Sequence, residues 1–379
     1  MTVCVVDDDD IAGSGEACDT LRVTAVHAAL RFGAFAVGRG GTSLNVGKEV
    51  VVTDGGLASN GAVVVLDSAE VTGATVSVAD LVDLHKSVRV TGQVRSGLDA
   101  LIGEKATVEG DVLAGANAAL GPQALVEGRV EAVGTVTLAA GATATGGTLS
   151  GATLPPVPPM TGLSLSLSAG TTDVTVAAGQ TLALAPGSYG NLRVRTGGVL
   201  ALQVGRYAFA TFNVDAGAQM TLDLTPVAGE ADVIVDVVGA LSTKDGASIR
   251  VVSSVGDARN VLFRVGGGQV QLGKNGAYVG TFVAPTGQIE LADSSMLVGM
   301  LYGEKVNLKS AARVTWLPAL DAFVATMVPV VPLAGIAADV DATEPPLGPD
   351  AALAEGAEVE PAPLAAAVYL PVVESFTGW

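Results

Sequence analysis

Apolar residues recur every six positions between residues 102 and 150. Written in sixes, this stretch reads IGEKAT, VEGDVL, AGANAA, LGPQAL, VEGRVE, AVGTVT, LAAGAT and ATGGTL. The first position of every hexad is apolar, and the fifth is small or β-branched. Neither the 3.6-residue period of a helix nor the two-residue period of a strand gives this register by itself. The pattern is typical of a β-solenoid with about three faces per coil.

A longer period is superimposed on the hexads. Short VTG, VEG or ATG motifs begin at Val71, Val90, Val108, Val126 and Ala144, separated by 19, 18, 18 and 18 residues. One coil per 18 or 19 residues would stack these positions in an inward ladder, and the glycine that ends each motif is expected at a corner with unusual φ. An antiparallel sandwich rich in Gly and Val is the alternative, but it has no reason to keep this register.

The repeats divide the chain into five parts. Residues 1–34 are expected to form an acidic segment and a cap, because a solenoid end exposes strand edges. Residues 35–154 form a first β-helix run, and residues 163–320 form a second with coils of 17–20 residues. Residues 155–162 contain PPVPP, which cannot lie inside a hydrogen-bonded ladder and predicts a loop or crossing strand between the runs. Residues 321–379 are a Pro/Ala/Glu-rich linker and an apolar tail.

The amino-acid composition predicts the kind of core and excludes some classes of partner. Of the 379 residues, 49% are hydrophobic but only 4% are aromatic, which predicts a thin core of Ala, Val and Leu. The net charge of −18 would repel nucleic acid and anionic membrane surfaces, so neither is an expected partner. No apolar run reaches the roughly 20 residues that span a bilayer. Cys4 and Cys18 are expected to form a disulfide if the protein is exported, and two free thiols otherwise.

The sequence offers little catalytic or metal chemistry. There are two histidines, His27 and His85, and no cluster has metal-ligand spacing, so no metal or cofactor is expected. The aspartates at Asp7–Asp10 lack the spacing of a calcium loop and indicate a solvated turn, although calcium binding stays open. The first 20 residues contain no basic region followed by a long apolar stretch, so they do not predict a secretory leader.

Two rival functions use the same kind of fold. Polysaccharide-degrading β-helices need carboxylates gathered on one face, whereas the acidic residues here are scattered. Because carboxylate pairs can assemble from distant coils, this rival stays open. Ice binding by threonine ladders is a weaker idea, suggested by Thr135 with Thr137 and Thr143 with Thr145. The scattered acidic residues are Asp111, Glu127, Glu131, Asp215 and Asp223.

Several segments of the second run are similar to a known pattern. LAPGSYGNLRV, VGRYAFATFNVDAGAQMTLD and YVGTFVAPTGQIELADSSMLVGMLYGEKVNLKSAARVTW follow one another in the chain. In this order they resemble a bacterial exported β-helical surface domain of pilin-like or adhesin-like proteins, over roughly residues 35–322. The hexads of residues 102–150 also resemble bactofilins, which are polymer-forming bacterial scaffolds. Both resemblances imply a right-handed β-helix and a structural role, and neither family supplies a catalytic motif.

We therefore expect an all-β protein, a single-stranded right-handed parallel β-helix with terminal caps. The favoured function is a structural bacterial surface or extracellular protein that assembles with copies of itself, with a filament as one form, and not an enzyme. Cell-surface components are further candidate partners. Alternatives are a polysaccharide-binding or polysaccharide-degrading β-helix, or a cytoplasmic bactofilin-like scaffold. The apolar tail residues expected to mediate assembly are Val368, Tyr369, Leu370, Val372, Val373, Phe376 and Trp379.

Overall fold

The computed structural model describes residues 32–39, 41–157, 159, 163–227 and 231–319. These residues form parallel strands arranged as a β-solenoid, which confirms the predicted fold class. Each coil has three sides, and strands of successive coils pair side by side to form three long sheets, here called faces A, B and C. The described residues contain no α-helix, and one 3-10 helix lies at Ala258–Asn260.

The strands of each face follow one another along the stack. Face A contains β20 (Val174–Val176), β23 (Asn191–Val194), β26 (Thr211–Val214), β29 (Leu241–Thr243), β32 (Val270–Leu272), β2 (Thr42–Val46), β5 (Ala62–Val65), β8 (Val82–Leu84), β11 (Ala100–Ile102), β14 (Ala118–Leu120) and β17 (Val136–Leu138). Face B contains β21 (Thr181–Leu184), β24 (Val199–Gln203), β27 (Gln219–Asp223), β30 (Ser248–Val251), β35 (Arg313–Trp316), β3 (Val51–Thr53), β6 (Glu70–Val71), β9 (Arg89–Val90), β12 (Thr107–Val108), β15 (Leu125–Val126) and β18 (Thr143–Ala144). Face C contains β22 (Gly187–Ser188), β25 (Gly205–Phe209), β28 (Val233–Val237), β31 (Val261–Val265), β1 (Phe32–Ala36), β4 (Gly56–Ser59), β7 (Thr75–Ser77), β10 (Val94–Ser96), β13 (Val112–Ala114), β16 (Val130–Ala132) and β19 (Thr148–Ser150). Two long strands, β33 (Ala277–Leu291) and β34 (Met296–Leu308), run round the corners and contribute to all three faces.

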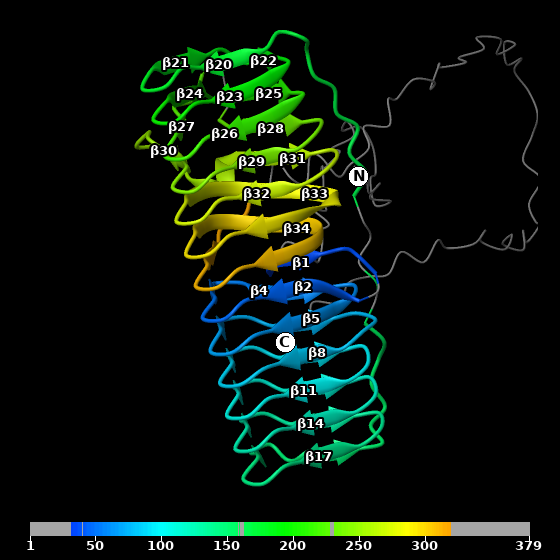
Figure 1. Cartoon of the computed structure of the whole chain (residues 1–379). Coiled ribbons are helices and arrows are strands. Elements are labelled where there is room, and N and C mark those ends of the chain that lie inside the picture. The colour runs from blue at the N-terminus through cyan, green and yellow to red at the C-terminus, as the bar shows by residue number, and fades with distance from the viewer. Residues whose placement is uncertain (1–31, 40, 158, 160–162, 228–230, 320–379) are drawn as a thin grey trace, which may run out of the picture. The chain divides into compact units, whose positions relative to one another are not determined.

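The order of the coils differs from the order of the chain. β1 lies between β34 and β4, with Ala34 opposite Leu301 on one side and Leu57 on the other. In the same way β35 pairs with β3, and the end of β34 pairs with β2. The last coil of the second run is therefore completed on face C by the first strand of the first run. In Figure 1, β1 and β34 lie in the middle of the stack, with β20–β22 at one end and β17 at the other.

Residues 151–157 and 163–167 lie along the outside of face C, between the two ends of the stack. After β19 the chain turns back, and the Ala152 amide donates to the Ala132 carbonyl. The Arg95 guanidinium then donates to the carbonyl of Pro155. In the following LSLSLS segment, Leu163 and Leu165 pack on a second apolar cluster that includes Phe35 and Tyr302. The prolines that predicted a loop or crossing strand thus lie in a segment that covers one face.

Inward side chains form the predicted ladders. Val71 pairs with Val90, Val90 with Val108, and Val108 with Val126, and all four are fully buried. The 18- or 19-residue period places one valine per coil on the same line, which is what keeps apolar atoms in contact from coil to coil. The predicted valine ladder is confirmed.

The motif glycines have a different role from the one predicted. Gly73, Gly92, Gly110 and Gly128 do not have positive φ. A Cβ on Gly92 would lie 2.5 Å from the backbone carbon of Gly73, and one on Gly110 would lie 2.7 Å from that of Gly92. These glycines allow the backbones of stacked coils to approach closely at one corner. Positive φ occurs instead at another corner, at Ser68, Ser87, Lys105 and Gln123.

Coil length also departs from the predicted range in part of the second run. Phe212 pairs with Leu241 and Leu241 with Val270, and the contact between Ser242 and Gln271 likewise spans 29 residues. The extra residues form excursions after β27 and β30, the second of which contains the 3-10 helix. Residues inserted at a corner do not change how the strands of successive coils pair. The 17–20-residue sequence period is therefore lost here, although the coils remain stacked in register.

Candidate functional site

The three faces differ in what they leave exposed. In the coils around the junction, outward side chains of face C are buried in the second apolar cluster, which includes Ala58, Val76, Val283 and Tyr302. Nearer the ends of face C, the outward Arg206 and Leu149 are exposed. Burial raises the pKa of the Tyr302 phenol, whose partner is the backbone of Leu163 in the crossing segment. Among the described residues, the surfaces left for recognition are therefore faces A and B, the outer parts of face C and the two end coils.

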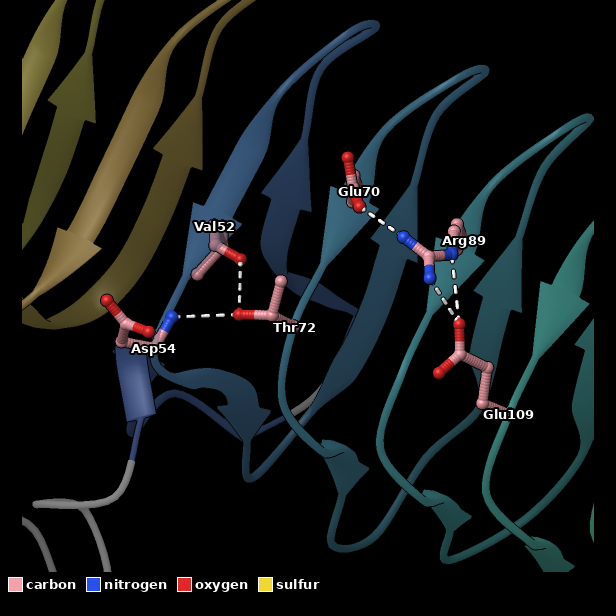
Figure 2. Close-up of polar contacts among 6 residues, drawn as sticks. All are labelled: Val52, Asp54, Glu70, Thr72, Arg89 and Glu109. Carbon is pink, nitrogen blue, oxygen red and sulfur yellow. Dashed lines mark hydrogen bonds and ion pairs between the residues drawn. The ribbon is translucent and has the colours of Figure 1, made fainter.

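A threonine ladder crosses the junction on face B. Thr53 lies opposite Thr315, and its hydroxyl donates to the Thr315 hydroxyl at 3.2 Å. Figure 2 shows Thr72 in the next coil, which donates to the Val52 carbonyl at 3.3 Å and accepts from the Asp54 amide at 2.8 Å. These hydroxyls already bond neighbouring coils, so they act as clamps between coils.

A charged ladder continues from the threonines. The Arg89 guanidinium donates to Glu70 at 2.6 Å and to Glu109 at 3.0 Å, linking three successive coils (Figure 2). The hydrogen bonds that the Arg89 guanidinium donates to Glu109 and Glu70 raise its pKa above the usual range. Face B is therefore neither uniformly apolar nor uniformly hydroxylated.

Ion pairs also connect coils at the corner between faces A and B. Lys48 lies 3.0 Å from Asp67, and Lys86 lies 3.0 Å from Glu104. The Lys48 ammonium lowers the pKa of Asp67 chiefly by its hydrogen bond, and Lys86 lowers that of Glu104 in the same way. Such exposed pairs contribute little stability individually. They do match opposite charges in successive coils, which favours the correct register.

The five scattered carboxylates predicted from the sequence mostly have structural partners. Asp111 accepts from the Arg129 amide at 2.8 Å, and Asp223 accepts from the Thr225 amide at 3.0 Å. Asp215 pairs with Arg193, and Glu131 pairs with Arg129. Glu127 is exposed. Within the described ranges no three His, Cys, Asp or Glu side chains are placed to hold a metal, and no helix is long and apolar enough to cross a membrane.

The predicted threonine pairs lie in the coil at one end of the stack but on different sides. Thr137 is on β17 of face A, whereas Thr143 and Thr145 belong to the strand and corner of face B. The hydroxyl of Thr135 donates to the Asn117 side chain at 3.1 Å. These threonines do not share one flat surface. The sequence pattern did not single out Thr53, Thr72 and Thr315, because their alignment depends on the junction between the runs.

The end coil of the first run exposes its interior. Ile102, Leu120 and Leu138 occupy the same inward ladder on face A. Ile102 and Leu120 are 1% and 2% exposed, whereas Leu138 is 48% exposed, because no further coil of the described residues covers it. Among the strands that the structure describes, β17, β18 and β19 each have a partner on one side only. This open coil combines unpaired strand edges with an apolar cross-section.

The opposite end coil is partly open. Within the described part of the chain, β20, β21 and β22 each pair only with the strand of the next coil. The inward Leu182 and Leu184 are partly buried, whereas Val176 of face A is 1% exposed. This end presents less apolar surface than the β17–β19 end, but its strand edges are unpaired in the same way.

Other predicted site residues lie outside the described residues. They are the cysteines Cys4 and Cys18, the aspartates Asp7–Asp10, the histidine His27, and the tail residues Val368, Tyr369, Leu370, Val372, Val373, Phe376 and Trp379. The roles expected for these residues stay predictions.

Comparisons with known proteins identify no family for this chain. No protein-family model matches the chain, and no curated protein sequence matches it. Among solved structures, the chain is similar to an ice binding protein from an Antarctic bacterium, Flavobacteriaceae, at 13% identity and a TM-score of 0.28. That alignment covers 76% of this chain and 97% of the other. The resemblance to pilin-like or adhesin-like domains and to bactofilins therefore gains no support from a family match.

Proposed function

We propose that this protein is a structural bacterial surface or extracellular protein that self-associates through the open ends of its solenoid. The observation that carries the proposal is the 48% exposure of Leu138, at a ladder position that is almost fully buried in the two preceding coils. Burying such a cross-section together with unpaired strand edges favours association. A filament is the form that repeated end-to-end contacts would produce.

The alternatives have less support on the described surface. Sugar-binding β-helices hold rings on exposed aromatic side chains. Among the described residues, the strongly exposed large apolar side chains are leucines, valines and a methionine, with no aromatic ring. Ice binding would need free hydroxyls in a regular array, whereas those of Thr53 and Thr72 bond neighbouring coils. A cytoplasmic bactofilin-like scaffold shares the proposed self-association and differs only in location.

Sedimentation velocity and electron microscopy test the proposal. The wild-type protein should form larger species as its concentration rises, and Leu138→Lys should weaken the association by about tenfold or more because it places a charge on the end surface. Leu101→Lys is the matched control, because Leu101 is 37% exposed on the outer side of face A in an interior coil. A wild-type protein that stays monomeric, or equal effects of the two variants, would refute the proposal.

A further inference from the structure

We infer that the partner of the β17–β19 coil is the β20–β22 coil of a second copy, stacked so that each strand pairs with the strand of the same face. β17 would meet β20, β18 would meet β21, and β19 would meet β22, all in parallel. This inference rests on the proposed self-association and names the surface that it uses. A contact between unlike ends leaves one free end on each side of the pair, so it can repeat along a filament.

The two end coils match in the length of their sides. β17 and β18 begin at Val136 and Thr143, and β20 and β21 begin at Val174 and Thr181, so both offsets are seven residues. β17 and β20 are also equal in length, at three residues each. Corners that follow sides of equal length superimpose, so β17 can pair with β20 and β18 with β21 without a bulge. On face C the offsets from β18 to β19 and from β21 to β22 differ by one residue.

The inward side chains of the two coils are compatible. In this register Val136 and Leu138 continue the ladder of Val174 and Val176. Because Val174 and Val176 are already 9% and 1% exposed, the surface newly buried at this end comes mainly from the partly buried Leu182 and Leu184. Ala144 would lie opposite Leu182, so a small side chain meets a large one. The exposed face of Leu138 would become buried, as it is for Leu120 one coil earlier.

Charge does not oppose the contact, although the chain carries a net charge of −18. Between residues 132 and 192 the sequence contains a single Asp, Glu, Lys or Arg, which is Asp173, whereas such residues make up 15% of the whole chain. This interval contains both end coils and the segment that connects them. Depletion of charged residues is a property of the centres of protein interfaces.

The chain path leaves both end surfaces clear in the described part of the molecule. After β19 the Ala152 amide bonds back to Ala132, on the coil above the end. Before β20, the Thr172 carbonyl accepts from the Gly190 amide, on the second coil from the other end. The entering and leaving segments thus run along the side of the stack.

The same type of contact already exists inside the molecule. At the junction of the two runs, β1, β2 and β3 pair with β34 and β35 on all three faces, although the chain does not run directly from one set to the other. Val306 there lies opposite Leu44, and Leu308 opposite Val46. Coils of this chain can therefore stack in register on strands to which they are not directly connected.

Disulfide cross-linking between two singly substituted proteins tests the interface, in a background in which Cys4 and Cys18 are replaced by serine. One copy carries Thr137→Cys on β17, and the other, enlarged by an affinity tag, carries Thr175→Cys on β20. Both positions are exposed on the outer side of face A. Paired neighbours on adjacent strands lie about 5 Å apart, within the Cα separation that a disulfide spans. Arg193→Cys, one coil further from the end, is the matched control.

The expected result is a rapid disulfide between position 137 of one copy and position 175 of the other, with little or none to position 193. Association by sedimentation without the 137–175 product would overturn this interface while leaving self-association intact. A dominant 137–137 product in the single variant would also overturn it, because that product requires two like ends to meet. Absence of any association would overturn both this inference and the proposed function.

Discussion

The two runs of the solenoid follow the same three-sided path with different side chains in the core. In the second run Phe263 stacks on Phe282, with ring centroids 4.6 Å apart, and Phe212 packs against Phe263 edge to face. In the first run the equivalent interior consists of Val, Ala, Leu and Ile, as at Val90, Val108 and Ile102. A few rings give large contact areas per coil, whereas the first run depends on many small, regular contacts.

The corners of the two runs differ as well. At the corner before face B, the second run has glycine with positive φ at Gly179, Gly197, Gly217 and Gly246. At the matching corner, the first run has non-glycine residues in this left-handed conformation, including Lys105 and Gln123. The comparison shows that the coil path does not demand one residue type at this corner. The second run uses glycine there more often, but Asn275, Ser294 and Ala311 of its later coils also have positive φ at this corner, as Gly141 does in the last coil of the first run.

The largest expected loss of stability comes from replacing a buried phenylalanine of the second run by alanine. Phe263→Ala should cost about 3–5 kcal/mol, and Val108→Ala, which removes fewer atoms from an equally buried site, should cost less. Because each coil contacts only its neighbours, the loss should be concentrated in the run that carries the substitution. Hydrogen exchange of backbone amides in each run measures this. Equal loss of protection in both runs from either variant would show that the runs unfold as one unit.

The next largest loss of stability is expected when a close-approach glycine of the first run is replaced by alanine. Gly110→Ala would place a Cβ 2.7 Å from the backbone carbon of Gly92 and should cost about 1–3 kcal/mol through overpacking. Denaturant unfolding measures the loss. Gly267→Ala is the control, because only one neighbouring atom, at 3.3 Å, lies close to its added Cβ. If the two variants lose the same stability, the glycine ladder does not depend on close approach.

The corner substitutions should have smaller and opposite effects. Gly197→Ala forces a Cβ into a conformation with φ of 69° and should destabilise the second run by about 1 kcal/mol. Gln123→Gly relieves the same conformation in the first run, at φ of 60°, and should be neutral or slightly stabilising. Thermal unfolding of the two variants compares the corners directly. A marked loss of stability in Gln123→Gly would mean that the Gln123 side chain, and not the backbone conformation, matters there.

The smallest expected effect is that of the corner ion pairs. Lys86 lowers the pKa of Glu104 and Lys48 lowers that of Asp67, so these carboxylates stabilise the fold above the pKa of about 4 that they have when unfolded. This contribution is lost as the pH falls through the lowered values. Lys86→Gln should therefore change thermal stability slightly at pH 7 and not at all at pH 2. An equal change at both pH values would point to lost packing of the lysine stem.

The sequence predicts the local path well, because the hexad and the 18-residue period fix which side chains point inward. Val71, Val90, Val108 and Val126 illustrate this, since each is buried in the expected ladder. The role of Gly92 and Gly110 was not predictable, because close backbone approach and positive φ both select glycine. The order of coils was also hidden, since periodicity assigns a residue to a face but does not say which coil lies next to it.

The position of the two open ends of the solenoid was likewise not predictable from the sequence. The sequence indicates that a solenoid has two ends, and it suggested that the chain termini would lie near them. In the described structure the ends are formed by residues in the middle of the chain, at β17–β19 and β20–β22, because β1 pairs with β34. The alternating LSLSLS segment was the available signal, since its leucines face the sheet that it covers.

The central claim is that the two runs meet at β1 and β34, so that the coils next to the crossing segment lie at opposite ends of one stack. Electron spin resonance distance measurement between labels at Thr145→Cys and Ala183→Cys tests it most directly, in protein lacking Cys4 and Cys18 and diluted with unlabelled copies. Both positions are exposed, on the end coils of face B. The account predicts a separation on the order of 60 Å, from coils about 4.8 Å apart. A separation below about 20 Å, as expected if coils follow one another in chain order, would contradict it.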